Sequence, residues 1–320
     1  MPTSPGCRRS AAFHPMLGSL APLYLLSLLL LAACTNTTAA GSAATATLSS
    51  STTSAHTGGS PAIMERMASS TSVGAGMTGA ISVTAYCPLG TTMLSGGYGL
   101  GGGDTATNTQ ILQDRPDTPS SWTVVAENAA VGGPYTLTTY ADCLKSKAPV
   151  VTHIVESAFS PPADGNYHEA SAACPNGSVV TGGGFASGIG ADASLPINGA
   201  GTARSANVWD TQIGMTQGQT QTPAIYAVCV DSTPPSSFRE GSIPTAAQPI
   251  TTTSGDLSIG CPAGQLLVGG GLALDHVGAN VYGSTLSADG SQWTVSATFF
   301  PFAGTPPAVT ETAYAVCVRT

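Results

Sequence analysis

The sequence predicts an all-β protein made of three similar units, and two observations carry this prediction. Only 8% of the residues are charged, while 39 are glycine and 23 are proline. Both residues disfavour helix interiors, so the composition favours short strands and turns. In addition, one segment recurs at an even interval, as CPLGTTMLSGG from Cys87, CPNGSVVTGGG from Cys174 and CPAGQLLVGGG from Cys261. We therefore expect three pseudo-symmetric repeats.

The N-terminus has the pattern of a secretory signal. Arg8 and Arg9 precede an uncharged stretch from Met16 to Ala33 that is rich in leucine. A basic region followed by an apolar region is typical of a signal peptide, and we expect one at residues 1–33. A signal cleaved at another position, or an uncleaved membrane helix, would share this pattern.

The apolar stretch ends in Leu-Ala-Ala-Cys at Cys34, which resembles the lipobox of bacterial lipoproteins. In that family the cysteine receives a diacylglycerol and becomes the mature N-terminus. The resemblance implies lipidation of Cys34 and a location at the extracellular face of the cell membrane. Residues 34–60 carry no charge, and Leu48 is their sole sizeable apolar side chain. Such a segment buries too little apolar surface to fold, so we expect a disordered tether.

After the tether, each unit shows four landmarks in the same order: a first cysteine, a tryptophan, a tyrosine and a second cysteine. The tryptophans are Trp122, Trp209 and Trp293, and the second cysteines, each at the end of Tyr-Ala-x-Cys, are Cys143, Cys229 and Cys317. Chance similarity does not produce this order three times. The landmarks predict repeats at residues 61–147, 148–235 and 236–320.

The cysteines of the repeats are expected to form disulfides. Six cysteines in a secreted chain allow fifteen connectivities, and the repeat favours pairing within each unit. The predicted pairs are Cys87 with Cys143, Cys174 with Cys229, and Cys261 with Cys317. Metal binding is the competing use of these cysteines. No C-x-x-C or local Cys/His cluster supplies four ligands, so the sequence predicts no metal and no cofactor.

The residues around the cysteines have the pattern of half-buried strands. Ile81, Val83 and Ala85 alternate with polar residues, which is the period of a strand with one buried face. The tryptophans also alternate with mostly apolar neighbours, so we expect core packing in preference to a sugar-stacking platform. In Cys-Pro-x-Gly, proline fixes φ and glycine permits a positive φ, which predicts a turn.

The glycine runs after these turns predict either a bulge or a closely approaching backbone. A loop that cradles phosphate is the functional alternative. It lacks support, because no GK[ST] follows and no helix pattern begins there. We therefore expect the runs to be scaffold.

The Cys-Pro-x-Gly segment with its glycine triplet resembles modules of uncharacterised secreted and surface proteins of bacteria, a family without an established activity. The segment CPLGTTMLSGGYGLGGGDTATN from Cys87 also resembles one repeat of vitelline membrane outer layer protein. Three Greek-key units of that family form a β-prism, which the resemblance implies here. Three separate β-sandwich or barrel beads are the alternative. The resemblance also implies saccharide binding at Asp104 and Asn108, residues that otherwise suit a turn.

Functional motifs are sparse. No G-x-S-x-G or H-E-x-x-H is present, so the sequence does not predict an enzyme. The net charge of −8 repels nucleic-acid phosphates. The expected function is that of a lipid-anchored extracellular surface protein that binds or structures cell-envelope or extracellular glycans without catalysis. A secreted hydrolase of surface polysaccharide and an inert envelope spacer are the alternatives.

Overall fold

The computed structural model describes most of the chain beyond residue 46. The described residues are 47–54, 63–74, 79–102, 109–128, 133–147, 149–160, 167–187, 200–205, 207–214, 222–232, 239–251, 256–274, 279–299 and 309–319. All of them belong to one compact unit, Ala43–Thr320. The signal region, Cys34, Asp104 and Asn108 lie outside the described residues.

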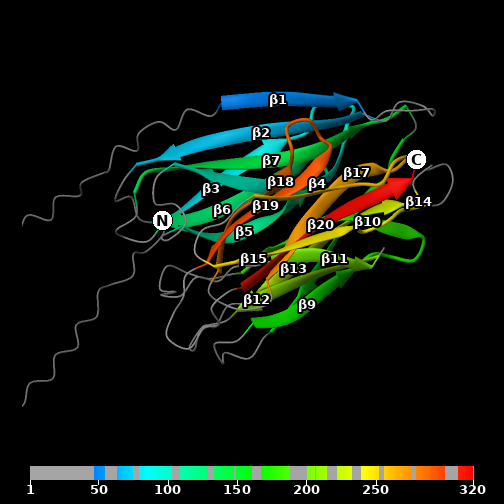
Figure 1. Cartoon of the computed structure of the whole chain (residues 1–320). Helices are drawn as coiled ribbons and strands as arrows, with labels where there is room; N and C mark the ends of the chain where they lie inside the picture. The colour runs from blue at the N-terminus through cyan, green and yellow to red at the C-terminus, as the bar shows by residue number, and fades with distance from the viewer. Residues whose placement is uncertain are drawn as a thin grey trace, which may run out of the picture. The chain divides into compact units, whose positions relative to one another are not determined.

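The protein is all-β, as predicted: every regular element of the described residues is a strand (Figure 1). The first repeat contains β2 (Ile63–Val73), β3 (Gly79–Tyr86), β4 (Thr92–Gly101), β5 (Thr109–Thr118), β6 (Ser121–Asn128) and β7 (Tyr135–Lys145). The second contains β8 (Thr152–Ala158), β9 (Tyr167–Ala173), β10 (Ser178–Ala186), β11 (Ala200–Ser205), β12 (Val208–Gly214) and β13 (Ala224–Asp231). The third contains β15 (Thr245–Ile250), β16 (Leu257–Gly260), β17 (Leu266–Leu274), β18 (Ala279–Leu286), β19 (Gln292–Phe299) and β20 (Val309–Arg319), preceded by the short β14 (Arg239–Glu240).

Each repeat forms two antiparallel groups of three strands. In the first group the strand that carries the second cysteine lies in the centre, giving the orders β2-β7-β4, β8-β13-β10 and β15-β20-β17. In the second group the tryptophan strand is central, giving β3-β6-β5, β9-β12-β11 and β16-β19-β18. The chain alternates between the two groups, which is a Greek-key-like path.

The sheets combine groups from different repeats. Strand β4 of the first repeat pairs with β18 of the third, and β10 of the second repeat pairs with β5 of the first. Between the third and second repeats, β17 contacts β11, although the described residues of these two strands show no ladder of paired residues. This cyclic exchange is the arrangement of a β-prism with open sheets. It rules out three separate beads, because no repeat has a complete sheet of its own.

Strand β1 (Thr47–Ser54) differs from the expected tether. It pairs along its whole length with β2, from Thr47 opposite Ser70 to Ser54 opposite Ile63, and so extends the edge of a sheet (Figure 1). Its sequence, TLSSSTTS, has little apolar surface. A strand can form backbone hydrogen bonds with an open sheet edge without burying apolar side chains, so a low apolar content does not exclude a strand here. The rest of the expected tether lies outside the described residues.

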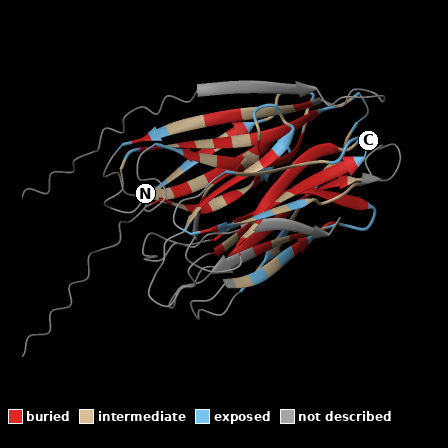
Figure 2. Cartoon of the chain, viewed as in Figure 1, coloured by how far each residue is buried: buried red, intermediate tan, exposed pale blue. Residues whose placement is uncertain are grey.

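The core lies between the sheets, where alternate residues point inward (Figure 2). Val83 and Ala85 are buried, as the alternation in β3 predicts, and Trp122, Trp209 and Trp293 are each no more than 2% exposed. In the turns, Gly90, Gly177 and Gly264 have φ values of 82°, 85° and 80°, which glycine adopts without strain.

Three disulfides close the repeats: Cys87–Cys143, Cys174–Cys229 and Cys261–Cys317. These are the pairs that the repeat predicts. Each joins the turn after one strand to the central strand of the neighbouring group, and so ties the two layers of a repeat together.

Candidate functional site at the prism axis

The glycine runs bring the three repeats together. Each run follows a β-bulge at the same position, where the register shifts between Met93 and Ser95, Val180 and Gly182, and Leu267 and Gly269. The residues after the bulge converge: a Cβ on Gly182 would lie 2.6 Å from Ser95 Cβ, and one on Gly269 would lie 3.0 Å from the same atom. Ser95, Gly182 and Gly269 therefore surround a common pseudo-threefold axis.

The glycine at the second position of each run, which is Gly96 in Ser95-Gly96-Gly97, lies against the tryptophan of its own repeat. A Cβ on Gly96, Gly183 or Gly270 would lie 2.3–2.4 Å from Cγ of the tryptophan of the same repeat. It would also lie 2.4–2.6 Å from a tyrosine carbonyl oxygen, that of Tyr140, Tyr226 or Tyr314. No side chain fits in this space. The expectation that the runs are scaffold thus has a specific cause, which is an indole ring lying on bare backbone.

The glycine at the third position of the run lies where two repeats meet. A Cβ on Gly97 would lie 1.9 Å from the Ser284 carbonyl oxygen, and one on Gly184 would lie 1.8 Å from that of Asp114. These carbonyl oxygens belong to β18 and β5, the strands contributed by the neighbouring repeat. The glycine at the third position therefore permits strands of two repeats to pair in one sheet.

A carboxylate lies at the axis. Ser95 Oγ donates to Asp142 Oδ2 at 2.8 Å and is also within 2.7 Å of the Val268 carbonyl oxygen. Asp142 is 1% exposed, and its Oδ1 has no hydrogen-bond partner. Burial raises the pKa of Asp142 to about 6, against the lowering effects of the Ser95 hydrogen bond and the Arg66 charge. The equivalent residues of the other repeats are Val228 and Val316, so the axis holds a single carboxylate.

A cavity lies beside the glycine runs and is lined by residues of all three repeats. Tyr98, Phe185 and Leu272, at equivalent positions after the runs, form part of its wall, together with Trp209 and Trp293. The free volume inside it is about 20 Å³, which is room for about one water molecule. Convergent aromatic rings and bare glycine backbone make this cavity the candidate functional site.

Asp114 is the carboxyl group that lines this cavity. Its Oδ1 accepts a hydrogen bond from Trp122 Nε1 at 2.6 Å. Burial raises the pKa of Asp114 to about 7, with an opposing effect from the Trp122 hydrogen bond. Burial, together with the Asp114 charge, raises the pKa of the neighbouring Tyr98 hydroxyl. The sequence hid this residue because a bulge between Ile111 and Gln113 interrupts the alternation of β5.

A third buried acid, Glu311 on β20, lies away from the residues that line the cavity. Its Oε2 accepts a hydrogen bond from Gln248 Nε2 at 3.1 Å, while Oε1 has no partner. Burial raises its pKa to about 7, the Gln248 hydrogen bond lowers it, and the nearby Asp256 charge raises it.

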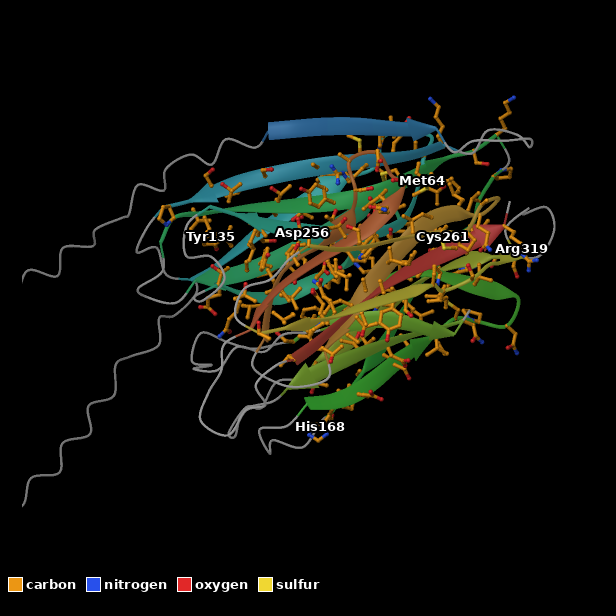
Figure 3. The ribbon with its side chains drawn as sticks, viewed as in Figure 1. Met64, Tyr135, His168, Asp256, Cys261 and Arg319 are labelled. Carbon is orange, nitrogen blue, oxygen red and sulfur yellow. A yellow bond between two sulfur atoms is a disulfide. The ribbon has the colours of Figure 1, made fainter. Side chains whose placement is uncertain are left out.

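His153 and His168 are not among the described residues that line the cavity. His153 lies on the edge strand β8, with Nε2 3.1 Å from Asp231 Oδ1, and both side chains are partly exposed. His168 lies on β9, well separated from Asp256 and from Cys261 (Figure 3). Within the described ranges, no three His, Cys, Asp or Glu side chains gather closely enough to hold a metal ion. Among the described residues, no helix is long and apolar enough to cross a membrane.

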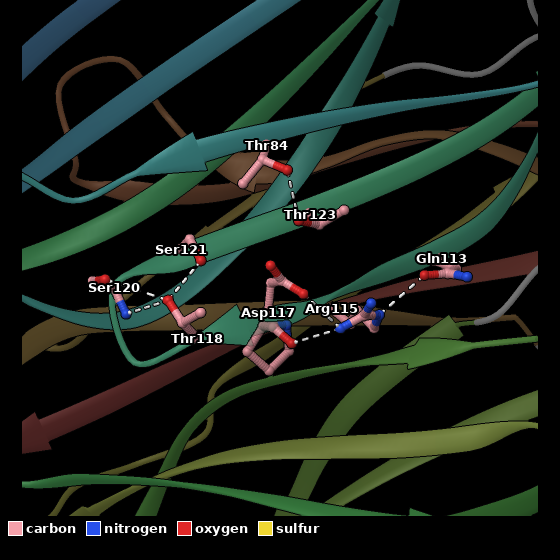
Figure 4. A network of polar contacts seen from close by, with 9 residues as sticks. Thr84, Gln113, Arg115, Asp117, Thr118, Ser120, Ser121 and Thr123 are labelled. Atoms are coloured by element: carbon pink, nitrogen blue, oxygen red, sulfur yellow. Dashed lines mark hydrogen bonds and ion pairs between the residues drawn. The ribbon is translucent and has the colours of Figure 1, made fainter.

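Two part-buried arginine side chains stack on the repeated tyrosines. The guanidinium of Arg66 lies 4.7 Å from the ring centre of Tyr140 and also donates to the Leu286 carbonyl oxygen of the third repeat. Arg115 lies 5.6 Å from the ring centre of Tyr226. The guanidinium of Arg115 also hydrogen-bonds Gln113 and pairs with Asp117 (Figure 4). Both arginines therefore join neighbouring repeats across a sheet junction.

No protein-family model matches this chain, and a search of curated proteins finds no similar sequence.

Proposed function

We propose that this protein is a lipid-anchored module of the bacterial cell surface, whose β-prism binds or organises envelope or extracellular glycans without catalysis. The observation that carries this proposal is the Leu-Ala-Ala-Cys motif at Cys34, directly after an apolar signal-like stretch. The three disulfides are consistent with an extracellular or otherwise oxidising location.

The use of the repeated residues supports a rigid, non-catalytic module. Each repeated cysteine forms a disulfide, each tryptophan packs on a glycine, and the glycines permit close strand contacts. These roles are structural and explain the repetition without a reaction. The cavity is lined by repeated glycines and tryptophans together with residues that differ between repeats, among them Asp114 and Tyr98.

Mass spectrometry of the protein purified from its native membrane tests the anchor. We expect Cys34 to be the N-terminal residue and to carry a diacylglycerol mass. Cys34→Ala should abolish this mass, whereas Cys7→Ala is a matched control and should leave it unchanged, because Cys7 lies in the signal that is removed. An unlipidated N-terminus in the wild type would refute the anchor.

Incubation of the purified protein with surface polysaccharides tests the second half of the proposal. We expect saturable binding without release of shorter fragments. Fragment release that is lost in Asp114→Asn would instead identify a hydrolase. The absence of any saturable ligand would identify a spacer.

A further inference from the structure

The exposed apolar side chains of the protein gather at one end of the prism. Among the described residues, the large hydrophobic side chains that are exposed are Tyr86, Leu89 and Val151. Tyr86 and Val151 are 62% and 50% exposed, and Leu89, in the turn after β3, is fully exposed. Single exposed apolar residues are common on protein surfaces and need no explanation, whereas a group of them marks an interaction site.

Strand register places these residues at the same end. Thr92 lies opposite Leu144, one residue before the end of β7, so the turn that carries Leu89 lies beside the end of that strand. At the end of β13, Asp231 N donates to the Val151 carbonyl oxygen. Strands β7 and β13 are equivalent and end on the same side of the bulges that meet at the axis. The apolar side chains therefore share one end of the prism.

The third repeat has its turn at this end as well. Figure 3 shows Cys261, directly before the turn, and Arg319, at the end of β20, on the same side of the molecule as Met64. Met64 lies opposite Leu144 in register. Tyr135, the first residue of β7, lies toward the other side (Figure 3).

Both lysines of the chain lie at this end. Lys145 is the last residue of β7, Lys147 follows shortly after it, and both are exposed. The net charge of the chain is −8, so the lysines form a local charge of the opposite sign. The acids described nearby are Asp231, which pairs with His153, and the half-buried Glu65. This end thus combines exposed apolar side chains with cationic ones.

The repeats show that the turn does not require these apolar side chains. Leu89 corresponds to Asn176 and Ala263 of the other repeats, where the next residue is likewise a glycine with a positive φ. Tyr86 corresponds to Ala173 of the second repeat. The same turn therefore forms with polar or small residues, and folding alone does not account for the apolar pair of the first repeat.

We propose that this end of the prism, formed by Tyr86, Leu89, Val151, Lys145 and Lys147 and called the basic end below, docks on the anionic lipid headgroups of a bilayer. In this contact Leu89 enters the boundary between headgroups and acyl chains. The Tyr86 ring lies at the level of the headgroups, and the lysines attract the lipid phosphates. The inference rests on the proposed lipid anchor, which would keep the prism beside a bilayer.

The length of chain between the anchor and the prism permits this contact. The 13 residues from Cys34 up to Thr47 span at most about 45 Å. Strand β1 runs from Thr47 to Ser54, which lies opposite Ile63 at the basic end. Its eight residues cover about 25 Å. Because the available chain is longer than β1, the basic end can touch the bilayer while the lipid on Cys34 is inserted in it.

Vesicle binding tests the inference. The mature chain, residues 34–320, is used in its disulfide-bonded form with Cys34→Ala, which removes the lipid and leaves the surface contact alone. We expect binding to vesicles of phosphatidylglycerol and phosphatidylcholine, and weaker binding to phosphatidylcholine alone. Added salt should weaken the binding by screening the lysines. In hydrogen exchange, the vesicles should protect the turn at residues 88–91 more than the equivalent turns at 175–178 and 262–265.

Two substitutions that copy the second repeat test the apolar contact. Leu89→Asn copies Asn176 and should weaken vesicle binding at least about tenfold, because a side chain inserted in the lipid is lost. Tyr86→Ala copies Ala173 and should weaken binding severalfold. Both variants should keep the melting temperature of the parent, since the second repeat carries these residues in the same turn.

Lysine substitutions and a control at the opposite end complete the test. Lys145→Gln and Lys147→Gln should each weaken binding about fivefold. Ala158→Asn changes an exposed residue at the other end of β8 and should leave binding unchanged. Binding that responds to the lysines but not to Leu89→Asn would show attraction by charge alone, and would overturn the docking on a bilayer. The absence of vesicle binding would overturn it as well.

The outcome is separable from that of the anchor. A native protein lipidated at Cys34, together with an unlipidated chain that does not bind vesicles, would leave the anchor standing and remove the docking surface. A native protein without the lipid, together with vesicle binding that depends on Leu89, would do the reverse.

Discussion

The first and second positions of the three glycine runs differ in how strictly they repeat. The second position is glycine in every run, Gly96, Gly183 and Gly270, because each lies under the tryptophan of its own repeat. The first position is Ser95 in one run and glycine in the other two, because all three residues meet at the axis. A contact within one repeat can occur three times, whereas a point on the axis has room for one side chain. At these two positions, identity between repeats reports packing within a repeat, and the difference reports the meeting point on the axis.

The largest expected effect comes from the position that always repeats. Gly183→Val would place Cβ 2.4 Å from both Trp209 Cγ and the Tyr226 carbonyl oxygen. We expect a loss comparable to the whole stability of a domain, about 5 kcal/mol or more. Denaturant unfolding measures this loss. Gly101→Ala is the control, because a Cβ there meets nothing within 4 Å. Equal stability of the two variants would contradict the role of the Trp–Gly contact.

The disulfides should contribute almost equally in the three repeats. The separations are 56, 55 and 56 residues, so the chain-entropy model gives about 4 kcal/mol for each. Replacing both cysteines of one pair with alanine, one repeat at a time, and measuring the unfolding free energy checks this. A loss confined to one repeat would show that the repeats are not energetically equivalent.

The buried carboxylates make stability depend on pH. Asp142 and Asp114 have folded-state pKa values of about 6 and about 7, above the ordinary value of 3.8. Between pH 4 and 7 the folded state holds protons that the unfolded state has lost, so the free energy of unfolding falls as the pH rises through this window. We expect a decrease of about 3 kcal/mol for Asp142 and about 4 kcal/mol for Asp114.

Thermal melting at pH 5 and pH 8 measures the part of this decrease that falls above pH 5, and the melting temperature should be higher at pH 5. Asp142→Val, which copies Val228 and Val316 of the other repeats, should reduce the difference and raise stability at pH 8. An unchanged difference in this variant would show that Asp142 does not titrate in the folded protein.

The smallest of these effects tests the axis itself. Gly182→Ser would bring a second side chain to within 2.6 Å of Ser95 Cβ, and we expect a loss of about 2 kcal/mol. Combining it with Ser95→Gly removes the Cβ–Cβ contact and should recover part of the loss, because the Cα of residue 95 and the Leu94 carbonyl oxygen remain 2.9 Å and 3.0 Å away. A double-mutant cycle in urea measures the coupling. Additive losses would mean that the two residues do not share one site.

Local patterns predicted the elements well where the physical cause was also local. The alternation of Ile81, Val83 and Ala85 indicated a half-buried strand, and the Cys-Pro-x-Gly turns required a positive φ at Gly90 and its equivalents. Even the disulfides followed from the interval between landmarks. By contrast, the sequence of the strand Thr47–Ser54 has no strand pattern. This strand forms through its pairing with the neighbouring open edge of β2.

The sequence by itself determined the strands, the turns, the cysteine pairs and the threefold repetition, because each depends on residues within one repeat. Only the tertiary structure decided which repeats share a sheet, that Ser95 and Asp142 meet at the axis, and that Trp209 lacks the partner that Trp122 and Trp293 have. These features depend on distances in space that strand pairing sets, whether the residues lie 8 positions apart, as Asp114 and Trp122 do, or in different repeats. The spacing of letters in a sequence carries no information about such distances until the strands have been paired.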